Sequence, residues 1–553
     1  MQQITHIIGG SGSGKTTKLL QIMQEMHDAG IQDPMSLGFV SFTRAARREA
    51  ASRAAKKFNV SLSDLEELGW FRTIHSVCYR ALKCGNELLT GDRGSKRWIE
   101  AALNESLSSS PIASDLEVEL TEDPFASATD AGIVLLLWDC ARHRLEPVRV
   151  VWERMTTCNG LMPGYDTCVS LIERYEQAKR LDGRCDFTDM IARFAGWEFT
   201  IKGPEPCTPD GDVPALPVWF HDEMQDSTAL LDSAFRRLTS TPECQHVFVA
   251  GDNFQSIYGF GGAEPSHFLN WRNNGAHCLT LPKSHRCPKP IHELGELILR
   301  GCSDYWDRKI QPADHNGDVS RVFGLSILRD IDPTETWLLL ARTRRHAGRM
   351  AAKLNRTQIP WVPTSGIGRW NNPKRQLGLS CLYHLEKGAV VGGVEWQQAI
   401  KLLPNTFQGE ALLAAGTRER FSKTNEAKLF LEIVVSDLTA VGGTAVLSDL
   451  LRNRQWRGIV DGGHDFAAAA DRYGLDLVQN PRVRVGTVHS AKGAEADNVF
   501  YLTTTTKAVT NGQMDPAGHN EECRVNYVAV TRARKQLIVA NEPSRQHRAR
   551  LPL

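Results

Sequence analysis

A glycine-rich loop near the start of the chain has the residue types that bind nucleotide phosphates. Residues 9–16 read GGSGSGKT, which fits GxxxxGK[ST], and they lie between an apolar stretch at residues 4–8 and a helical pattern. Glycine lets successive backbone N–H groups point at phosphate oxygens, and the following helix adds the positive end of its dipole. Lys15 is predicted to hold the β- and γ-phosphates, and Thr16 to bind Mg²⁺. The rest of the predicted phosphate cradle is Gly12, Ser13 and Gly14.

Two acids follow a second apolar segment. Residues 218–220 (Val-Trp-Phe) lead into His221, Asp222 and Glu223, and the carboxyl end of a core strand is where a phosphate-loop fold needs acids. Asp222 is predicted to bind Mg²⁺ through water, and Glu223 to orient and deprotonate the attacking water. An isolated acidic cluster is more often a solvated turn. In a chain that also has a phosphate loop, the catalytic interpretation is favoured.

Alternating strands and helices are expected to position these residues. Residues 37–42 predict a short apolar strand, residues 43–57 a helix with a basic face, and residues 246–250 another core strand. Strand-then-helix units imply a parallel sheet, so the fold class is α/β. Residues 84–178 are mainly helical and are interpreted as an inserted subdomain. Residues 203–217, with five prolines, predict an exposed loop.

Composition describes an ordinary globular enzyme of several domains. The chain has 553 residues, enough for about three or four units. Its net charge is +1, so any nucleic-acid surface must be local. The 13 cysteines form no CxxC pair and are expected to be reduced and mostly buried. With no apolar run of membrane-spanning length and no secretory pattern, we expect a cytoplasmic enzyme, in the host cytoplasm if viral, without a membrane partner.

A longer motif makes the resemblance to a known family specific. Residues 251–263 read GDNFQSIYGFGGA and resemble the GDxxQSIYGxxGA motif of the UvrD/Rep-like superfamily 1 DNA helicases. Further segments are similar to other motifs of that family, in the family's order. They are residues 41–46 (FTNKAA type), 73–76 (TxHS), 186–190 (DFxDLL), 222–226 (DExQD), 281–286 (LxxNYR), 486–495 (TxHxxKGxE) and 527–534 (YVAxTRAR).

The resemblance implies two RecA-like P-loop domains, each with a mainly helical inserted subdomain, and ATP in the cleft between the two domains. The unmatched stretches fall where the family has its insertions, and the second is short for the family. The expected boundaries are residues 1–84 and 179–283 for the first RecA-like domain, 85–178 for its insertion, 284–373 and 481–553 for the second RecA-like domain, and 374–480 for the second, reduced insertion.

The resemblance also implies roles at the nucleotide. Arg286 and Arg532 resemble the family's two arginine fingers, both from the second RecA-like domain, which would reach the γ-phosphate when the cleft is closed. Gln255 is expected to sense the γ-phosphate. Glu495 either hydrogen-bonds the ribose or makes an ordinary surface contact. The sequence departs from the family at His285, where a tyrosine normally stacks on the base, and at Thr17, where an arginine often completes that stack.

The DNA-side motifs imply residues for binding single-stranded DNA without reading its sequence. Such binding uses aromatic stacking beside a positive groove. The alternative for each aromatic is a core position at a strand end, and each histidine either contacts phosphate or is a hydrogen-bonded core residue. The predicted DNA-binding residues are Phe42, Thr43, Arg44, His75, Tyr258, Phe260 and His489.

The sequence therefore predicts an ATP- and Mg²⁺-dependent DNA translocase and helicase. Its expected partners are single-stranded DNA, junctions of single- and double-stranded DNA, and replication or repair proteins. The form of the motif at Lys492 and Gly493 resembles the branch that moves 3′ to 5′. A neighbouring hypothesis is a translocase that strips proteins from single strands and unwinds poorly. From another class, the phosphate loop would also allow a small-molecule kinase in which Glu223 or Asp222 activates a hydroxyl.

Overall fold

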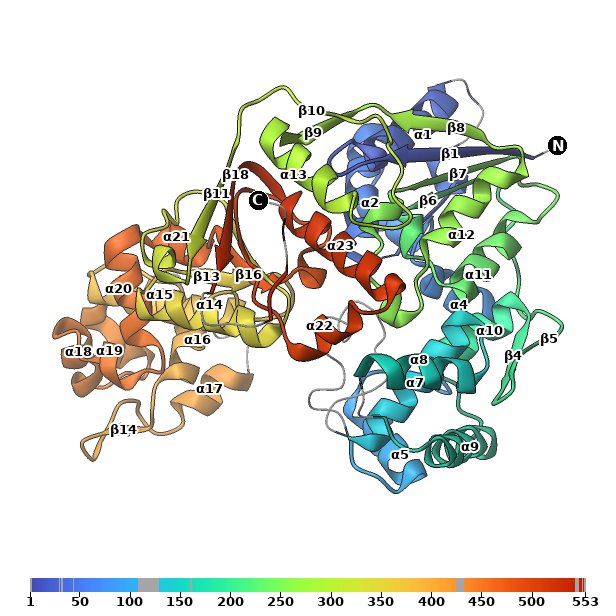
Figure 1. The fold of residues 1–553 in the computed structure, drawn as a ribbon. Helices are drawn as coiled ribbons and strands as arrows, with labels where there is room; N and C mark the ends of the chain where they lie inside the picture. The colour runs from blue at the N-terminus through green and yellow to red at the C-terminus, as the bar shows by residue number, and fades with distance from the viewer. Residues whose placement is uncertain are drawn as a thin grey trace. The chain divides into compact units, whose positions relative to one another are not determined.

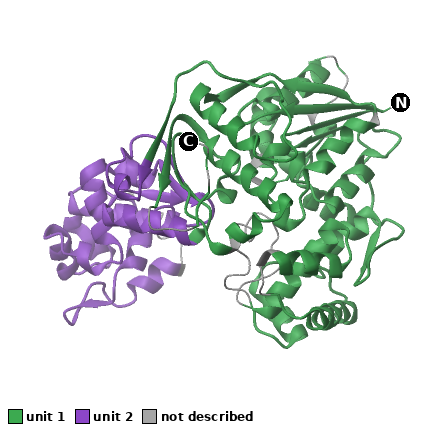
Figure 2. Ribbon diagram, viewed as in Figure 1, with its two compact units in different colours: residues 1–321, 340–344, 487–553 green, residues 322–339, 345–486 purple. Residues whose placement is uncertain are grey.

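The computed structural model divides the chain into two compact units (Figure 2). The first unit comprises residues 1–321, 340–344 and 487–553, and the second comprises residues 322–339 and 345–486. The chain passes from one unit to the other in β11 (Asp318–Phe323), β12 (Trp337–Ala341), α14 (Arg344–Arg356) and β16 (Val483–Thr487). The residues that the structure describes are 2–28, 30, 33–42, 44–107, 129–159, 162–423, 432–542, 547–549 and 551.

A six-stranded sheet organises the amino-terminal part of the first unit (Figure 1). Its order is β3-β2-β6-β7-β1-β8, and every pairing between neighbours is parallel. The central strands are apolar along their length because helices cover both faces. This confirms the predicted parallel α/β arrangement. The strands are β1 (Gln3–Gly9), β2 (Gly38–Ser41), β3 (Trp70–Arg72), β6 (Val218–Asp222), β7 (His246–Gly251) and β8 (His277–Leu281).

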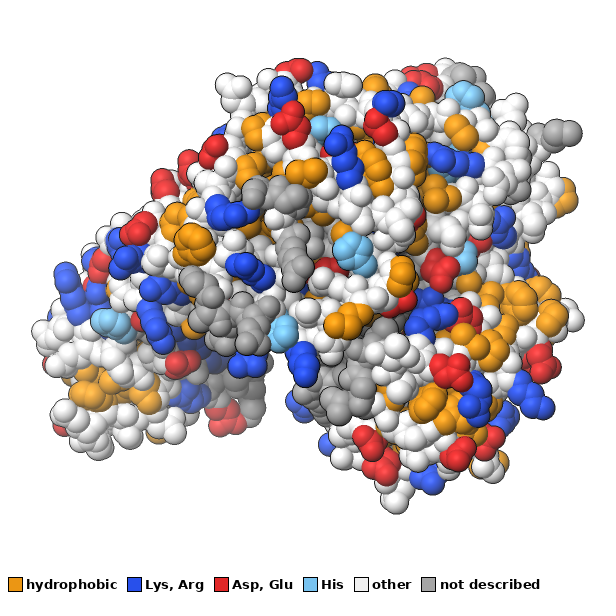
Figure 3. Space-filling view, viewed as in Figure 1, with side chains coloured by type: hydrophobic (Ala, Val, Ile, Leu, Met, Phe, Trp, Pro, Cys, Tyr) orange, Lys and Arg blue, Asp and Glu red, His pale blue; other side chains and the backbone are white. Residues whose placement is uncertain are grey.

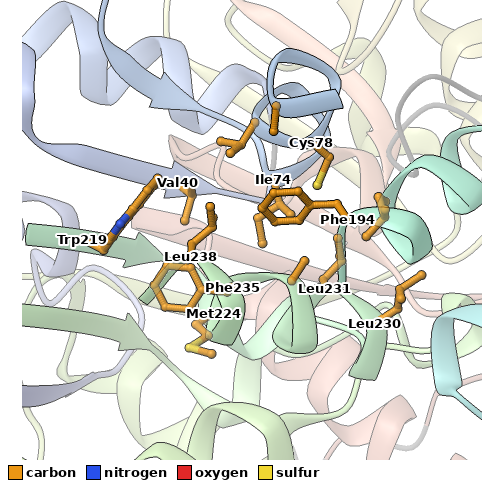
Figure 4. Packing of buried hydrophobic residues seen from close by; sticks show 14 of the residues in the cluster. Val40, Ile74, Cys78, Phe194, Trp219, Met224, Leu230, Leu231, Phe235 and Leu238 are labelled. Atoms are coloured by element: carbon orange, nitrogen blue, oxygen red, sulfur yellow. The ribbon is translucent and has the colours of Figure 1, made fainter. Parts of the chain in front are cut away.

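Two hydrophobic cores lie on the two faces of this sheet. On one face, α1 (Lys15–Asp28) and α2 (Arg44–Phe58) pack Leu19, Met23 and alanines against the strands, with α3 (Leu62–Glu67) nearby. The other face carries the cluster drawn in Figure 4, which joins Val40 and Trp219 of the strands to side chains from three helices. These helices are α4 (Ile74–Leu82), α10 (Phe187–Ala195) and α11 (Ala229–Thr239).

Polar caps set where these helices begin. Thr73 accepts a hydrogen bond from the Ser76 amide at the start of α4, and Thr228 does the same for Leu231 at the start of α11. Asp186 and Asp189 form a reciprocal capping box at the start of α10. These caps satisfy amides that have no partner inside the helix. Part of the DFxDLL-like segment therefore has a structural use.

Helices fill the stretch between α4 and α10, as predicted. They surround their own core, which includes Trp138 and Tyr175, and residues 108–128 of the predicted insertion lie outside the described residues. The prediction of a loop over residues 203–217 is wrong at its start, because β4 (Trp197–Thr200) pairs with β5 (Gly203–Pro206) in an antiparallel hairpin. The helices are α5 (Arg93–Leu103), α7 (Asp130–Arg144), α8 (Val148–Asn159) and α9 (Tyr165–Asp182).

The carboxyl-terminal part of the first unit supplies the other elements near the phosphate loop. Strands β17 and β18 pair in parallel, and α13 packs against α23. Short helical segments and α12 (Pro265–Asn270) join β7 to β8. The elements are β9 (Lys283–Pro288), α13 (Lys289–Leu299), β10 (Gln311–Ala313), β17 (Ala496–Leu502), α22 (Lys507–Gly512), α23 (Pro516–Val530) and β18 (Ala533–Asn541).

The second unit is mainly helical. Its core gathers three buried tryptophans, Trp370, Trp396 and Trp456, and β13 (Trp361–Pro363) pairs in parallel with β16. A short hairpin joins β14 (Thr406–Phe407) to β15 (Glu410–Ala411). The helices are α15 (Pro373–Glu386), α16 (Gly393–Leu402), α17 (Thr417–Lys423), α18 (Ala445–Arg452), α19 (Trp456–Ile459), α20 (Gly463–Tyr473) and α21 (Leu475–Gln479).

Surface and thiol features agree with the composition. On the face drawn in Figure 3, Lys and Arg side chains are interspersed with Asp and Glu, as expected for a net charge of +1. The cysteines that the structure describes are free thiols, and most are buried. Within the described ranges, each helix is too short or too polar to cross a bilayer.

Candidate active site

Three adjacent strands bring the phosphate loop and the acidic motifs to one edge of the first sheet. Strand β7 lies between β1 and β6 and is parallel to both. The carboxyl ends of parallel strands meet at one edge, where ligands bind in open α/β sheets. The loop after β1, the acids after β6 and the Asp252 to Gln255 turn after β7 therefore converge.

The phosphate loop has the backbone conformation that its glycines predict. Gly12 and Gly14 have φ values of +69° and +83°, in the region that favours glycine. The Lys15 ammonium lies at the start of α1, 3.3 Å from the Gly9 carbonyl oxygen and 4.0 Å from a Glu223 carboxylate oxygen. The Ser13 hydroxyl is buried and has no hydrogen-bond partner in the described part of the chain. These groups leave donors available for an anion.

The two acids after β6 face different partners. The Thr16 hydroxyl donates to the Asp222 carboxylate, whereas Glu223 accepts a 2.5 Å hydrogen bond from the Gln225 side-chain amide. Burial and the Glu223 charge raise the pKa of Asp222. Burial also acts to raise the pKa of Glu223, but Lys15 and Lys492 outweigh it, so that pKa is lowered. The two carboxyl groups are thus set apart for different roles.

Arginines from the carboxyl-terminal part of the unit reach the phosphate loop. Arg286 Nη1 donates to Ser11 Oγ at 2.9 Å, and Arg532 Nη2 donates to the same oxygen at 3.2 Å. Arg532 Nη2 also lies 2.9 Å from Gln255 Oε1. Burial and the nearby Arg286 charge lower the pKa of Arg532 to about 10. The loop therefore lies beside positive charge that an anion would stabilise.

A lysine connects the acidic motif to the turn after β7. Lys492 Nζ is 2.5 Å from both Asp226 carboxylate oxygens and donates to the Gln255 carbonyl oxygen at 2.5 Å. The Gln255 side-chain amide donates to Asp252 at 2.8 Å. The amide orientation of Gln255 is therefore fixed from two sides, with its oxygen toward Arg532.

The remaining nucleotide candidates have other contacts here. The Glu495 carboxylate accepts from Arg286 Nε at 2.5 Å and also binds Arg534. His285 is exposed, and its backbone N–H donates to the Gly12 carbonyl oxygen at 2.8 Å. Thr17 is exposed, and its hydroxyl accepts from Arg53 at 2.5 Å. Their contacts to ribose or base stay predictions.

Four of the predicted DNA-binding residues form one aromatic cluster. Phe42 stacks on Tyr258 with ring centroids 5.3 Å apart, and Phe260 packs edge-on against His489 at 5.5 Å. The Tyr258 hydroxyl donates to the His489 carbonyl oxygen at 3.3 Å, and Lys492 Nζ lies 5.1 Å from the Tyr258 ring centre. Burial lowers the pKa of His489 well below its usual value, so this ring is neutral near pH 7.

The other DNA candidates lie apart from this aromatic cluster or outside the described atoms. His75, in α4, packs edge-on against Phe187 at 6.4 Å. Thr43 lies outside the described residues, and the side chain of Arg44 is not described either, although Arg44 begins α2. Their DNA contacts stay predictions.

The structure adds groups to which motif matching assigned no role. Tyr527 Oη accepts from the Ser11 amide at 3.3 Å, Lys492 bridges two motifs, and Arg308 pairs with Asp252. Tyr527 and Lys492 lie inside motif matches, which was the available signal. Arg308 lies outside all of them, so its place follows only from tertiary structure.

The residues at this edge fit a magnesium nucleotide. Thr16 and Asp222 offer the hydroxyl and carboxylate oxygens that Mg²⁺ prefers. The buried Ser13 hydroxyl and the glycine amides can meet phosphate oxygens, and the lowered Arg532 pKa indicates positive charge that lacks full compensation. Both the anion and the cation of such a ligand thus have partners.

Family models match both ends of the chain. The model of the UvrD/REP helicase N-terminal domain matches residues 1–275, and that of the UvrD-like helicase C-terminal domain matches residues 470–542. These ranges contain the phosphate loop, the acids, Gln255 and Arg532. Arg286 and Arg308 lie between the two matched ranges.

Curated relatives cover nearly all of the chain at low identity. YjcD of Bacillus subtilis (strain 168) is 22% identical over 626 aligned positions, covering 98% of this chain and 77% of YjcD. DNA helicase II of Rickettsia typhi is 22% identical over 628 positions, covering 98% of this chain and 90% of that protein. ATP-dependent DNA helicase PcrA of Staphylococcus aureus (strain Mu50) is 22% identical over 335 positions, or 59% of this chain and 42% of PcrA.

Proposed function

The chain belongs to the UvrD/Rep-like family of superfamily 1 helicases, and we propose that it is an ATP-dependent DNA helicase that moves 3′ to 5′ along one strand. The observation that carries the proposal is the position of Arg532. Its guanidinium lies within hydrogen-bond distance of Gln255 and of Ser11 in the phosphate loop. Groups from both ends of the chain therefore meet where the γ-phosphate is expected.

Each residue at the site has a distinct task in hydrolysis. The phosphate-loop amides and Lys15 hold the phosphates, and bound Mg²⁺, held by Thr16 and Asp222, supplies charge neutralisation. Glu223, ionised near pH 7 because of the neighbouring ammonium groups, accepts the proton of the attacking water. Arg286 and Arg532 stabilise the negative charge that develops on the γ-phosphate.

Contacts between the nucleotide site and the aromatic cluster offer a route for coupling to DNA. Lys492 binds both Asp226 and the Gln255 carbonyl, and it also lies over the ring of Tyr258. Movement of Gln255 toward or away from a γ-phosphate would therefore shift a lysine that contacts the aromatic cluster. In this proposal, Phe42, Tyr258 and Phe260 stack on bases when single-stranded DNA opens that cluster.

ATP hydrolysis measured with and without single-stranded DNA tests the proposal. We expect single-stranded DNA to stimulate turnover at least 10-fold, a threshold of about 1.4 kcal/mol in activation free energy. Partial duplexes with a 3′ or 5′ overhang then test polarity, and unwinding only from the 3′ overhang supports the proposal. Stimulated turnover without strand separation would favour the protein-stripping translocase. Turnover that ignores DNA but transfers phosphate to a small hydroxyl compound would favour the kinase.

A further inference from the structure

Arg308 is a buried guanidinium outside every recognised motif. It lies between α13 and β10, and its side chain is only 1% exposed. Nη1 donates to Asp252 Oδ1 at 2.5 Å, and Nη2 donates to Glu296 Oε1 at 2.8 Å. A charge this deeply buried requires partners of opposite charge. Arg308 has two, and one of them belongs to the turn that carries Gln255.

Asp252 transmits the position of Arg308 to the Gln255 side chain. Asp252 is fully buried, and its second carboxylate oxygen accepts from Gln255 Nε2 at 2.8 Å. This contact directs Gln255 Oε1 toward Arg532 Nη2, 2.9 Å away. Because Arg308 keeps Asp252 ionised and fixed, it determines which end of the Gln255 amide faces the arginine.

Arg308 also contacts the helix that precedes Arg532. Its Nη2 lies 3.3 Å from Tyr527 Oη, and the guanidinium carbon lies 5.4 Å from the Tyr527 ring centre. Tyr527 is in α23, which ends at Val530, and its hydroxyl accepts from the Ser11 amide of the phosphate loop. Arg308 thus touches both structures that place Gln255 and Arg532 opposite each other.

We propose that Arg308 is a positioning residue for ATP hydrolysis, holding Gln255 and Arg532 in register with the phosphate loop. The inference rests on the proposed function, because it assumes that Gln255 and Arg532 act on the γ-phosphate. Lysine cannot replace arginine here. One ammonium cannot bind Asp252 and Glu296 in the directions of a planar guanidinium and also lie against the Tyr527 ring.

Steady-state ATP hydrolysis by Arg308→Lys tests the inference. We expect kcat to fall about 10- to 100-fold, while the KM for ATP changes less than about 3-fold, because the positioned groups act in the transition state. In a Gln255→Ala background, the same substitution should lower kcat less than about 2-fold, because the group through which Arg308 acts is already absent. A full additive loss in that background would overturn the inference.

Arg142→Lys is the matched control for loss of a buried ion pair. Arg142, in α7, is 3% exposed and binds Asp186 at 3.0 Å and Asp189 at 2.8 Å. Both lysine variants should lower the thermal midpoint, but only Arg308→Lys should lower kcat. Equal losses of kcat in the two variants would refute the positioning role.

Tyr527→Phe gives a second measurement that is less demanding on folding. It keeps the ring and removes the hydroxyl that meets Arg308 and Ser11. We expect kcat to fall about 3- to 10-fold at unchanged KM, the range for loss of one neutral hydrogen bond. An unchanged kcat would contradict the inference. Wild-type turnover that ignores single-stranded DNA would instead reject the proposed function, while the variants would still decide the role of Arg308.

Discussion

At the scale of single residues, the backbone of Glu223 separates two neighbouring carboxylates. Its φ is +54°, which is uncommon for a residue with a side chain, and such strain is concentrated at functional sites. Asp222 contacts Thr16, while Glu223 contacts Gln225 and lies near Lys15. The turn therefore lets one acid serve the metal and the other serve the water.

Glu223→Gln should remove the proton acceptor and preserve the shape of the site. We expect kcat for ATP hydrolysis to fall about 10²- to 10⁴-fold, the usual contribution of a general base. Affinity for single-stranded DNA, measured by fluorescence anisotropy, should stay within about 2-fold, a difference below about 0.5 kcal/mol. Glu205→Gln, at an exposed position of β5, is the control. Turnover equal to wild type would remove Glu223 from the mechanism.

At the scale of elements, β9 lies directly against the phosphate loop. The Ser284 hydroxyl donates to the Ser11 carbonyl at 2.7 Å, and the His285 amide donates to the Gly12 carbonyl at 2.8 Å. A Cβ on Gly12 would lie 2.3 Å from the Arg286 Cβ. This position therefore requires glycine for its positive φ and for the approach of β9.

Gly12→Ala should separate the loop from β9 and displace Arg286. We expect kcat/KM for ATP to fall at least about 100-fold, because the loop and one arginine both lose their positions. Gly183→Ala is the control, since Gly183 has φ of +61° with open space around it and tests the backbone strain alone, about 1–2 kcal/mol. Equal kcat/KM in Gly12→Ala and the control would show that the β9 contact has no part in catalysis.

Strand β1 contains a buried histidine that makes folding sensitive to acid. His6 is fully buried, lies 3.0 Å from the Phe268 carbonyl oxygen and stacks on that ring. Burial, with a smaller effect of Arg272, lowers the pKa of His6 to about 4. The unfolded chain binds this proton more readily, so the stability is complete above about pH 6.5 and is lost as pH falls toward about 4.

His6→Gln should reduce this acid sensitivity. Glutamine can still donate to the Phe268 carbonyl but does not titrate. Between about pH 7 and pH 4.5, the free energy of unfolding of wild type should fall by up to roughly 3 kcal/mol more than that of the variant, at about 1.36 kcal/mol per pKa unit. Urea unfolding followed by circular dichroism at both pH values measures this. Identical pH dependence in the two proteins would mean that His6 is not the titrating group.

How far the sequence predicts these elements depends on how local each signal is. The phosphate loop, the strands β1, β6 and β7, and the acids of β6 follow from short patterns of apolar and turn residues. The β4–β5 hairpin was missed because its prolines indicate a loop, although Pro204 and Pro206 lie in an edge strand that tolerates them. Arg308 could not be found, because its partners Asp252 and Tyr527 are 56 and 219 residues away.

At the scale of the whole molecule, catalysis depends on contacts between distant parts of the chain. Ser11 and Arg532 are 521 residues apart, and Ser11 and Arg286 are 275 apart. These contacts form only when the elements after β8 pack against the phosphate-loop edge of the first sheet. Hydrolysis can therefore report on that packing, which is what coupling to movement on DNA requires.

ATP turnover by Arg532→Ala, at saturating single-stranded DNA, tests this central claim most directly. Lys535→Ala, which removes an exposed cation three residues away, serves as the control. The account predicts that kcat falls about 10³- to 10⁵-fold, as for loss of an arginine finger, while DNA affinity and the control's turnover stay close to wild type. Turnover by Arg532→Ala within a few-fold of wild type would contradict the account.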